Sequence, residues 1–199
     1  MKHQNPILLD ANGFPIATRS LLLTTVASNL DMVDFIDLDD TFTRYVVEID
    51  NLVPNGDGDL EVRVSFAADF KAGVADYSWS AMSHQSNAGV GTSQDDSDDV
   101  ISLNRNGVNV RWGSQANENG DVTVMITRGD TGVYPRILAT TVSNNDSNIL
   151  MRTTAAGIYR GLTSGATPSG GIDGIRFFFR NGTTDLLIQQ GNFRLYGVE

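Results

Sequence analysis

Few residues of this chain could perform acid–base or nucleophilic chemistry. A serine nucleophile needs a basic partner, and the sequence offers two histidines, His3 and His84. His3 lies close to the N-terminus, and His84 lies in a polar Ser-His-Gln-Ser segment that is typical of a surface loop. The sequence has no Gly-x-Ser-x-Gly turn and no Gly-x-x-x-x-Gly-Lys loop. The common signatures of serine hydrolases and phosphate-binding enzymes are therefore missing.

Paired carboxylates could still cleave glycosidic bonds, because the two acids of a glycosidase can come from separate strands. The glutamates in the body of the chain are Glu48, Glu61 and Glu118. The alternation of their segments puts Glu48 and Glu61 on outward faces of strands, and Glu118 falls in a turn near Gly120. We therefore expect no catalytic residue, and a glycan-degrading enzyme stays only as a third hypothesis.

Two acidic segments have oxygen ligands that could hold calcium. Asn55, Asp57 and Asp59 alternate as in a calcium loop, but Leu60 replaces the sixth-position glycine and Phe66 the twelfth-position glutamate. The run Asp95-Asp96-Ser97-Asp98-Asp99 would need oxygens from a second loop. We expect a solvated hairpin turn and a solvated loop, and we predict no metal and no cofactor, while calcium binding by either segment stays open. The absence of cysteine excludes disulfides and cysteine-based zinc sites.

Aromatic side chains on strands could instead form stacking platforms for sugars. The candidates for ligand contact are Trp79 and Trp112, together with Tyr77, Tyr134 and Tyr159. Aromatic residues on strands are more often part of a core or an interface, so sugar stacking is an alternative hypothesis.

The elements that must position these residues are strands, because runs with a period of two recur between turn signals. The clearest segments are 42–49, 60–66, 108–112, 122–127, 174–180 and 191–199, and weaker ones are 21–27, 32–38, 76–82, 100–103 and 135–142. We expect segments 42–49 and 60–66 to be antiparallel neighbours, joined by a Gly- and Asn-rich connection. Segments 83–99, 143–148 and 163–171 are predicted loops.

These segments predict an all-β, single-domain, antiparallel β-sandwich that is jelly-roll-like. Residues 1–20 contain Pro6 and Pro15 and predict an extended N-terminal arm, followed by the sandwich domain over 21–199. The formal net charge of −10, from 24 acidic and 14 basic residues, argues against nucleic acid as a partner. No secretory signal or membrane-spanning apolar stretch is visible, so we expect synthesis in a cytoplasm and no membrane insertion.

Several motifs taken together resemble a recurring group of phage and prophage proteins. The matching segments are Tyr45-Val-Val-Glu-Ile-Asp-Asn51 with Pro54, Leu60 with Arg63 and Ser65, Tyr77-Ser-Trp79, Gly174-Ile-Arg-Phe-Phe-Phe, and Gly191-Asn-Phe-Arg-Leu-Tyr-Gly197. The resemblance covers residues from about 42 to 199 and is strongest at the end. The group is similar to virion structural components encoded among head and tail genes, and no catalytic residue comes with the pattern. The acidic run at Gln94 to Asp99 departs from it.

The resemblance implies a non-enzymatic bacteriophage virion structural protein, made in the host bacterial cytoplasm and located in the virion. Capsid decoration and a tail or tail-fibre role both stay open. Expected partners are other virion proteins and further copies of the same chain in a homo-oligomer. We expect the arm, with Asn5, Pro6, Phe14 and Pro15, to be the assembly element. The alternative is a carbohydrate- or host-receptor-binding β-sandwich module whose partner is a host surface glycan.

Overall fold

The structure is a computed structural model of the chain, and it describes residues 19–38, 40–87, 89–105, 111–115, 117–130, 132–145, 147, 149–161 and 170–198. The predicted assembly arm, with Asn5, Pro6, Phe14 and Pro15, lies outside the described residues, as do most of the predicted strand 108–112 and of the predicted loop 163–171. Within the described part no helix is long and apolar enough to cross a membrane.

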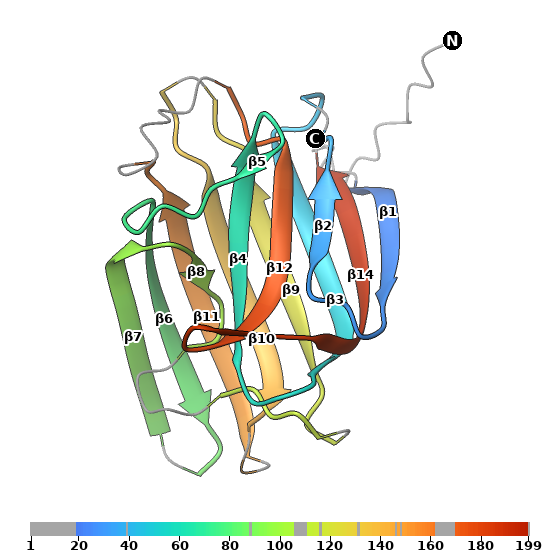
Figure 1. Ribbon diagram of the computed structural model, residues 1–199, viewed down its shortest axis with the longest axis vertical. Helices are drawn as coiled ribbons and strands as arrows, with labels where there is room; N and C mark the ends of the chain where they lie inside the picture. The colour runs from blue at the N-terminus through green and yellow to red at the C-terminus, as the bar shows by residue number, and fades with distance from the viewer. Residues whose placement is uncertain are drawn as a thin grey trace, which may run out of the picture.

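The described chain forms two packed antiparallel β-sheets (Figure 1). The strands are β1 (Arg19–Ala27), β2 (Val33–Ile36), β3 (Arg44–Pro54), β4 (Asp59–Phe66), β5 (Asp69–Phe70), β6 (Tyr77–Gln85), β7 (Gly89–Asp98), β8 (Ile101–Ser102), β9 (Gly120–Thr127), β10 (Arg136–Asn144), β11 (Leu150–Tyr159), β12 (Gly174–Asn181), β13 (Thr184–Leu186) and β14 (Ile188–Val198). The large sheet has eight strands in the order β1-β14-β3-β9-β10-β11-β6-β7. The small sheet has the order β13-β12-β4-β5, with β2 paired to β12 and β8 paired to β4. The predicted all-β sandwich is confirmed.

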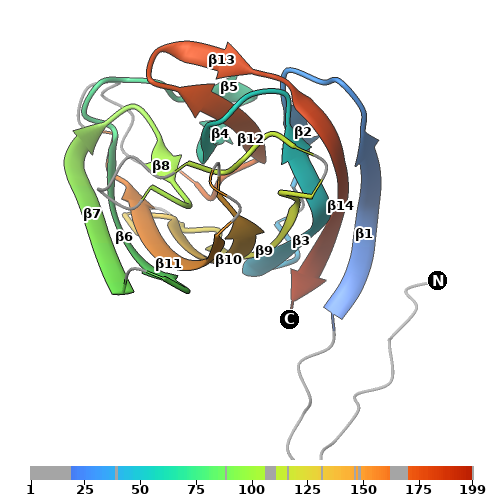
Figure 2. The same ribbon diagram turned by 90° about the horizontal axis from the view of Figure 1, so that it is seen from below.

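The large sheet curves around the small sheet, from β7 at one edge to β1 at the other (Figure 2). Alternation along the strands explains this packing: β9 shows a strict buried–exposed repeat over Gly120–Thr127. Buried core side chains from the large sheet include Tyr45, Val47, Ile49, Val124, Ile126 and Phe193, and those from the small sheet include Val62, Val64, Ile175, Phe177 and Phe179. The core therefore lies between the concave face of the large sheet and the inner face of the small one.

The predicted pairing of segments 42–49 and 60–66 is wrong. β3 lies in the large sheet between β14 and β9, whereas β4 lies in the small sheet beside β12. The connection that follows Pro54 crosses from one sheet to the other instead of folding back as a hairpin. Both strands present an apolar face to the same core, so alternation alone could not distinguish a sheet neighbour from a partner in the opposite layer.

The predicted loop at 83–99 is also wrong, because β6 continues to Gln85 and β7 covers Gly89–Asp98. β11 (Leu150–Tyr159) was not predicted, since its inner face carries small or polar side chains such as Thr153 and Ala155. The jelly-roll connectivity is not confirmed: β9, β10 and β11 form a simple meander within one sheet. The chain does end on a strand, as the closing segment predicts, because β14 runs to Val198 and pairs with both β1 and β3.

Candidate functional site

The outer face of the large sheet carries a continuous row of side chains, one from each strand. Paired positions define it: Leu21, Tyr196, Val46, Met125, Leu138, Ala156, Ser80 and Gln94. Met125 and Leu138, at its centre, are 46% and 45% exposed. The row is apolar from β1 to β11 and polar on β6 and β7.

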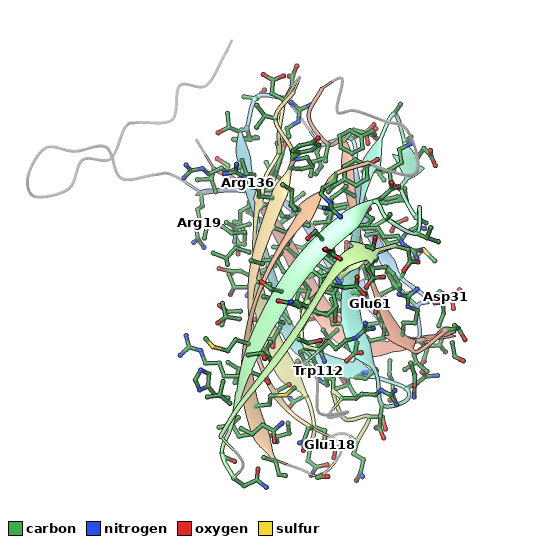
Figure 3. All side chains as sticks on the ribbon, turned by 90° about the vertical axis from the view of Figure 1, so that its left-hand side faces the viewer. Arg19, Asp31, Glu61, Trp112, Glu118 and Arg136 are labelled. Atoms are coloured by element: carbon green, nitrogen blue, oxygen red, sulfur yellow. The ribbon has the colours of Figure 1, made fainter. Side chains whose placement is uncertain are left out.

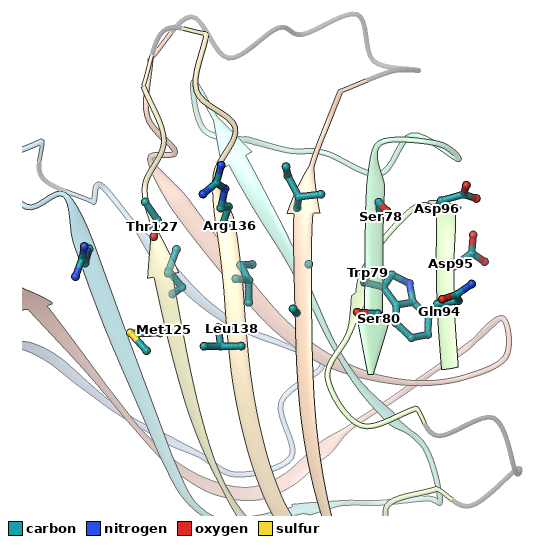
Figure 4. Close-up of a pocket in the computed structure, with 16 residues that line it drawn as sticks. Ser78, Trp79, Ser80, Gln94, Asp95, Asp96, Met125, Thr127, Arg136 and Leu138 are labelled. Carbon is teal, nitrogen blue, oxygen red and sulfur yellow. The ribbon is translucent and has the colours of Figure 1, made fainter. Parts of the chain in front are cut away.

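A hollow of about 890 Å³ lies on this face between β3 and β7 (Figure 4). Met125, Leu138 and Ala156 from the apolar row form its floor. We call this feature the hollow; it could accept a ligand, and it is defined by these three residues and those around them.

Two arginines border the hollow at the β3 and β10 side. Arg44 on β3 and Arg136 on β10 are both exposed, and both pair in register with Thr127 on the intervening β9. Neither guanidinium takes part in an ion pair among the residues that the structure describes. Since both side chains project from the outward face, they give this side of the hollow two uncompensated positive charges.

The opposite side of the hollow is polar and acidic. Ser78 and Ser80 come from β6, and Gln94, Asp95 and Asp96 from β7. Asp95 accepts a hydrogen bond from the Ser97 amide at 2.9 Å, which fixes the carboxylate beside the strand. The Arg160 guanidinium donates to the main-chain carbonyl of Asp96. The hollow therefore has an apolar floor, a basic side and an acidic, hydroxyl-rich side.

The rest of the acidic run belongs to a different structure, which we call the ion cluster. The ion cluster consists of Asp59, Glu61, Arg63, Asp98, Asp99, Arg105 and Arg180, on the outward face of the small sheet beneath the β7–β8 segment. Arg180 contacts Glu61 at 2.8 Å and Asp99 at 3.0 Å. Arg105 contacts Asp59 at 3.1 Å and Glu61 at 3.2 Å. The predicted solvated loop is thus half strand and half structural ion cluster.

Burial controls the protonation of the ion cluster. Burial raises the pKa of Glu61 to about 8, even though Arg180 and Arg105 lie beside it. Burial would also raise the pKa of Asp99, but the hydrogen bond and charge of Arg180, with the charge of Arg63, lower it to about 2. Burial raises the pKa of Asp59 and Asp98 as well. Because Glu61 has no exposed side-chain surface, this perturbed carboxyl group cannot reach a substrate.

The three candidate glutamates are not brought together. Glu48 lies on the outer face of the large sheet and pairs with Arg19 and Arg194. Glu61 lies beyond the core on the small sheet, and it is fully buried rather than facing solvent as predicted. Glu118 is buried at the end of the sandwich, where its carboxylate accepts the Gln115 amide at 2.9 Å. Figure 3 shows Glu61 and Glu118 well apart. No two of these carboxyl groups share a cleft, as glycosidase chemistry requires.

The two tryptophans expected to contact a ligand are buried, which corrects that expectation. Trp112 is 0% exposed, its Nε1 donates to the carbonyl of Glu118 at 3.1 Å, and its ring packs edge-on against Phe179. Trp79 borders the hollow but is only 4% exposed, and its Nε1 donates to Asp98 at 2.9 Å. An indole ring enclosed in this way cannot offer a face to a sugar.

Of the other aromatic candidates, Tyr77 and Tyr159 are buried and pack against each other, whereas Tyr134 is 38% exposed. His84 is exposed on β6, so it does not sit in an enclosed site, and His3 lies outside the described residues.

The alternating oxygens at 55–59 serve the fold. Asn55 accepts the Leu187 amide at 2.9 Å, Asp57 accepts the Ser114 amide at 3.1 Å, and Asp59 binds Arg105. No group of three acidic or histidine side chains in the described part of the chain is arranged to hold a metal ion.

Comparison with known proteins adds no relative. No protein-family model matches the chain, and a search of curated proteins finds no match.

The arginines of the hollow were missed at the sequence level because Arg44 and Arg136 are far apart in the chain. One signal could have indicated these two arginines. Each lies near the start of a predicted strand, at a position whose side chain points away from the core.

Proposed function

We propose that this chain is a non-enzymatic bacteriophage virion structural protein, a capsid-decoration or tail component, that acts by assembling with identical copies. The motif resemblance supports the virion role. The structural observation that supports assembly is the exposed apolar edge at β1. The scattered positions of the candidate acids agree with a role that needs no catalysis.

β1 is an edge strand of the large sheet, and no other described segment pairs with its free side. Its sequence is unusually apolar for an edge. Val26 is 69% exposed, Leu21 57%, Leu23 46% and Leu22 40%. Natural sheets protect exposed edges with charges, prolines or coverings, so an uncovered leucine-rich edge marks a contact surface.

The partner that fits this edge best is a second copy of the chain. When a two-fold axis relates two β1 strands, they run antiparallel and their main-chain donors and acceptors can pair. Two copies can therefore join through the same segment. The chain has a formal net charge of −10, yet Arg19–Ala27 contains no acidic residue and one arginine. Two copies that meet at β1 therefore bring no acidic side chains of this strand together. The opposite edge, β7, carries Asp95, Asp96 and Asp98, whose charges disfavour edge pairing.

Light scattering on the full chain tests the assembly proposal. The wild-type chain should have the mass of a dimer. Val26→Lys should reduce that mass to a monomer, because a charge on the edge strand opposes pairing. Val90→Lys is the matched control, since Val90 is 58% exposed on the other edge strand. A wild-type monomer at high concentration, or equal effects of both changes, would overturn the proposal.

Incorporation into particles tests the virion role separately. A tagged full chain produced during phage growth should co-purify with particles, and deletion of residues 1–15 should abolish this while the fold persists. Incorporation that is unchanged by the deletion would reject the arm as the attachment element. A chain that never enters particles would reject the virion role.

A second candidate function, binding of a carbohydrate or host receptor, is supported by one observation. The hollow on the outer face is wide, open and lined by both apolar and polar groups, as a glycan site requires. This candidate is compatible with assembly through β1, because the hollow and the β1 edge are formed by different strands.

A further inference from the structure

The distribution of charge around the hollow restricts the class of ligand. Arg44 and Arg136 flank Thr127 across two strand spacings, a separation of about 9–10 Å. By contrast, Arg63, Arg105, Arg176 and Arg180 are all engaged by carboxylates. Two neighbouring arginines that form no ion pair with the described residues of an acidic protein favour binding of an anionic group.

The remainder of the hollow suits a chain of sugar rings. It extends over six strands from β3 to β7, which corresponds to about 24 Å across five spacings. Met125, Leu138 and Ala156 offer an apolar floor for the C–H faces of the rings. Gln94, Ser80 and the carboxylates of Asp95 and Asp96 offer acceptors and donors for hydroxyl groups. Several sugar units fit this length, whereas one would leave most of the hollow empty.

We propose that the hollow binds an acidic oligosaccharide whose carboxylate lies between Arg44 and Arg136. This inference rests on the second candidate function, and it names the class of glycan. Asp95 and Asp96 repel an anion at the opposite side of the hollow, so they fix the direction of the ligand. Their carboxylates accept hydrogen bonds from the hydroxyl groups of the ligand instead.

The experiment measures binding of the full chain to two matched probes: a hexamer of neutral sugars that ends in a single uronic acid, and the same hexamer with that carboxylate methyl-esterified. The acidic hexamer should bind, more weakly as salt is raised, and the ester should bind at least about tenfold more weakly. Arg44→Ala and Arg136→Ala should each weaken acidic binding about tenfold, the usual loss for one charge-assisted contact. Arg152→Ala is the matched control: Arg152 is an exposed arginine of β11, outside the residues that line the hollow.

The outcomes separate this inference from the function on which it rests. Equal binding of both probes, unaffected by the arginine changes, would keep glycan binding and overturn the acidic preference. A loss of binding in Arg152→Ala equal to that in Arg136→Ala would also overturn it, because attraction would then be a property of the whole face. If neither probe binds, and no neutral or sulfated glycan on an array binds either, both the acidic preference and glycan binding by the hollow are overturned. The assembly proposal is unaffected by any of these results.

Discussion

The Nε atom of Arg180 lies 2.8 Å from Oε2 of Glu61, and this contact lies on the outward face of the small sheet. Arg180 also binds Asp99, which follows β7, so one guanidinium connects β12, β4 and the segment that covers them. Arg105 completes the arrangement from the other side, where its guanidinium also lies 5.4 Å from the ring of Trp79. The cluster is therefore a clamp between the small sheet and the β7–β8 segment. The raised pKa of Glu61 in this cluster makes the free energy of unfolding depend on pH.

Glu61→Gln should flatten that dependence between pH 5 and 8. The folded chain keeps a proton on Glu61 up to pH about 8, whereas the unfolded chain releases it near 4.5, so raising the pH in this window lowers the free energy of unfolding. Each pKa unit corresponds to about 1.4 kcal/mol, so the wild-type loss amounts to a few kcal/mol. Urea unfolding at pH 5.5, 7 and 9 measures the slope. Glu48→Gln on the large sheet is the control. Identical slopes in wild type and Glu61→Gln would show that Glu61 is not the titrating group.

Asp99→Asn should loosen the β7–β8 segment from the small sheet. Asp99 accepts from both nitrogens of the Arg180 fork at 3.0 and 3.1 Å and also binds Arg63, so its loss leaves two guanidiniums without their shared partner. We expect a cost of about 1–3 kcal/mol. Hydrogen exchange should accelerate in residues 98–105 and remain slow in β9. Asp96→Asn, on the exposed side of the same run, should change neither. Uniformly faster exchange would mean that the change unfolds the whole chain and that the clamp is not local.

Gly157→Ala should be strongly coupled to Ile101→Ala. A Cβ atom at Gly157 would lie 2.6 Å from two carbons of the Ile101 side chain, which is fully buried. Each single change should therefore destabilise the fold, the first by a clash and the second by a cavity. The double variant should be more stable than the sum of the two costs predicts, by about 1 kcal/mol or more. Gly170→Ala, where a Cβ would meet nothing within 4 Å, is the control. Additive costs would show that β8 does not pack on Gly157.

Arg176→Lys should weaken the attachment of β2. Arg176 on β12 binds both carboxylate oxygens of Asp34 at 2.7 and 2.8 Å, and its guanidinium lies 4.1 Å from the ring of Phe70. A lysine keeps the charge but loses both the planar fork and the stacking. The expected loss is about 1 kcal/mol, measured as a lower midpoint of urea unfolding. Arg152→Lys, at an exposed arginine on β11, should leave the midpoint unchanged. A smaller effect at Arg176 than at Arg152 would contradict the prediction.

The fold class could be predicted because the strands at 60–66, 122–127 and 174–180 place apolar side chains at alternate positions, on the face that packs into the core. Alternation of Leu60, Val62 and Val64 reports this directly. The signal fails where the inner face is small or hydroxylated, as at Ser83, Thr141 and Thr153, which form one row across β6, β11 and β10. It also fails at β7, where charge suggests a loop although the backbone pairs with β6.

The candidate site could not be predicted, for a different reason. Arg44 and Arg136 meet through the register of β9, and register depends on which strands become neighbours. The ion cluster likewise joins Glu61, Asp99 and Arg180 through the crossing of the β7–β8 segment over the small sheet. Hydrophobic pattern determines which face of a strand is buried, but not the strand that lies beside it.

The difference between the two edges of the large sheet limits how far it can grow. An endless ribbon of stacked sheets needs two edges that accept a neighbour, and here β1 offers leucines while β7 offers aspartates. When β1 of one chain pairs with β1 of a second copy, neither β1 edge remains free. The two free edges of the large sheets in the pair are then the acidic β7 strands. Pairing through β1 therefore terminates itself at two chains, and any larger particle must obtain its symmetry from other surfaces.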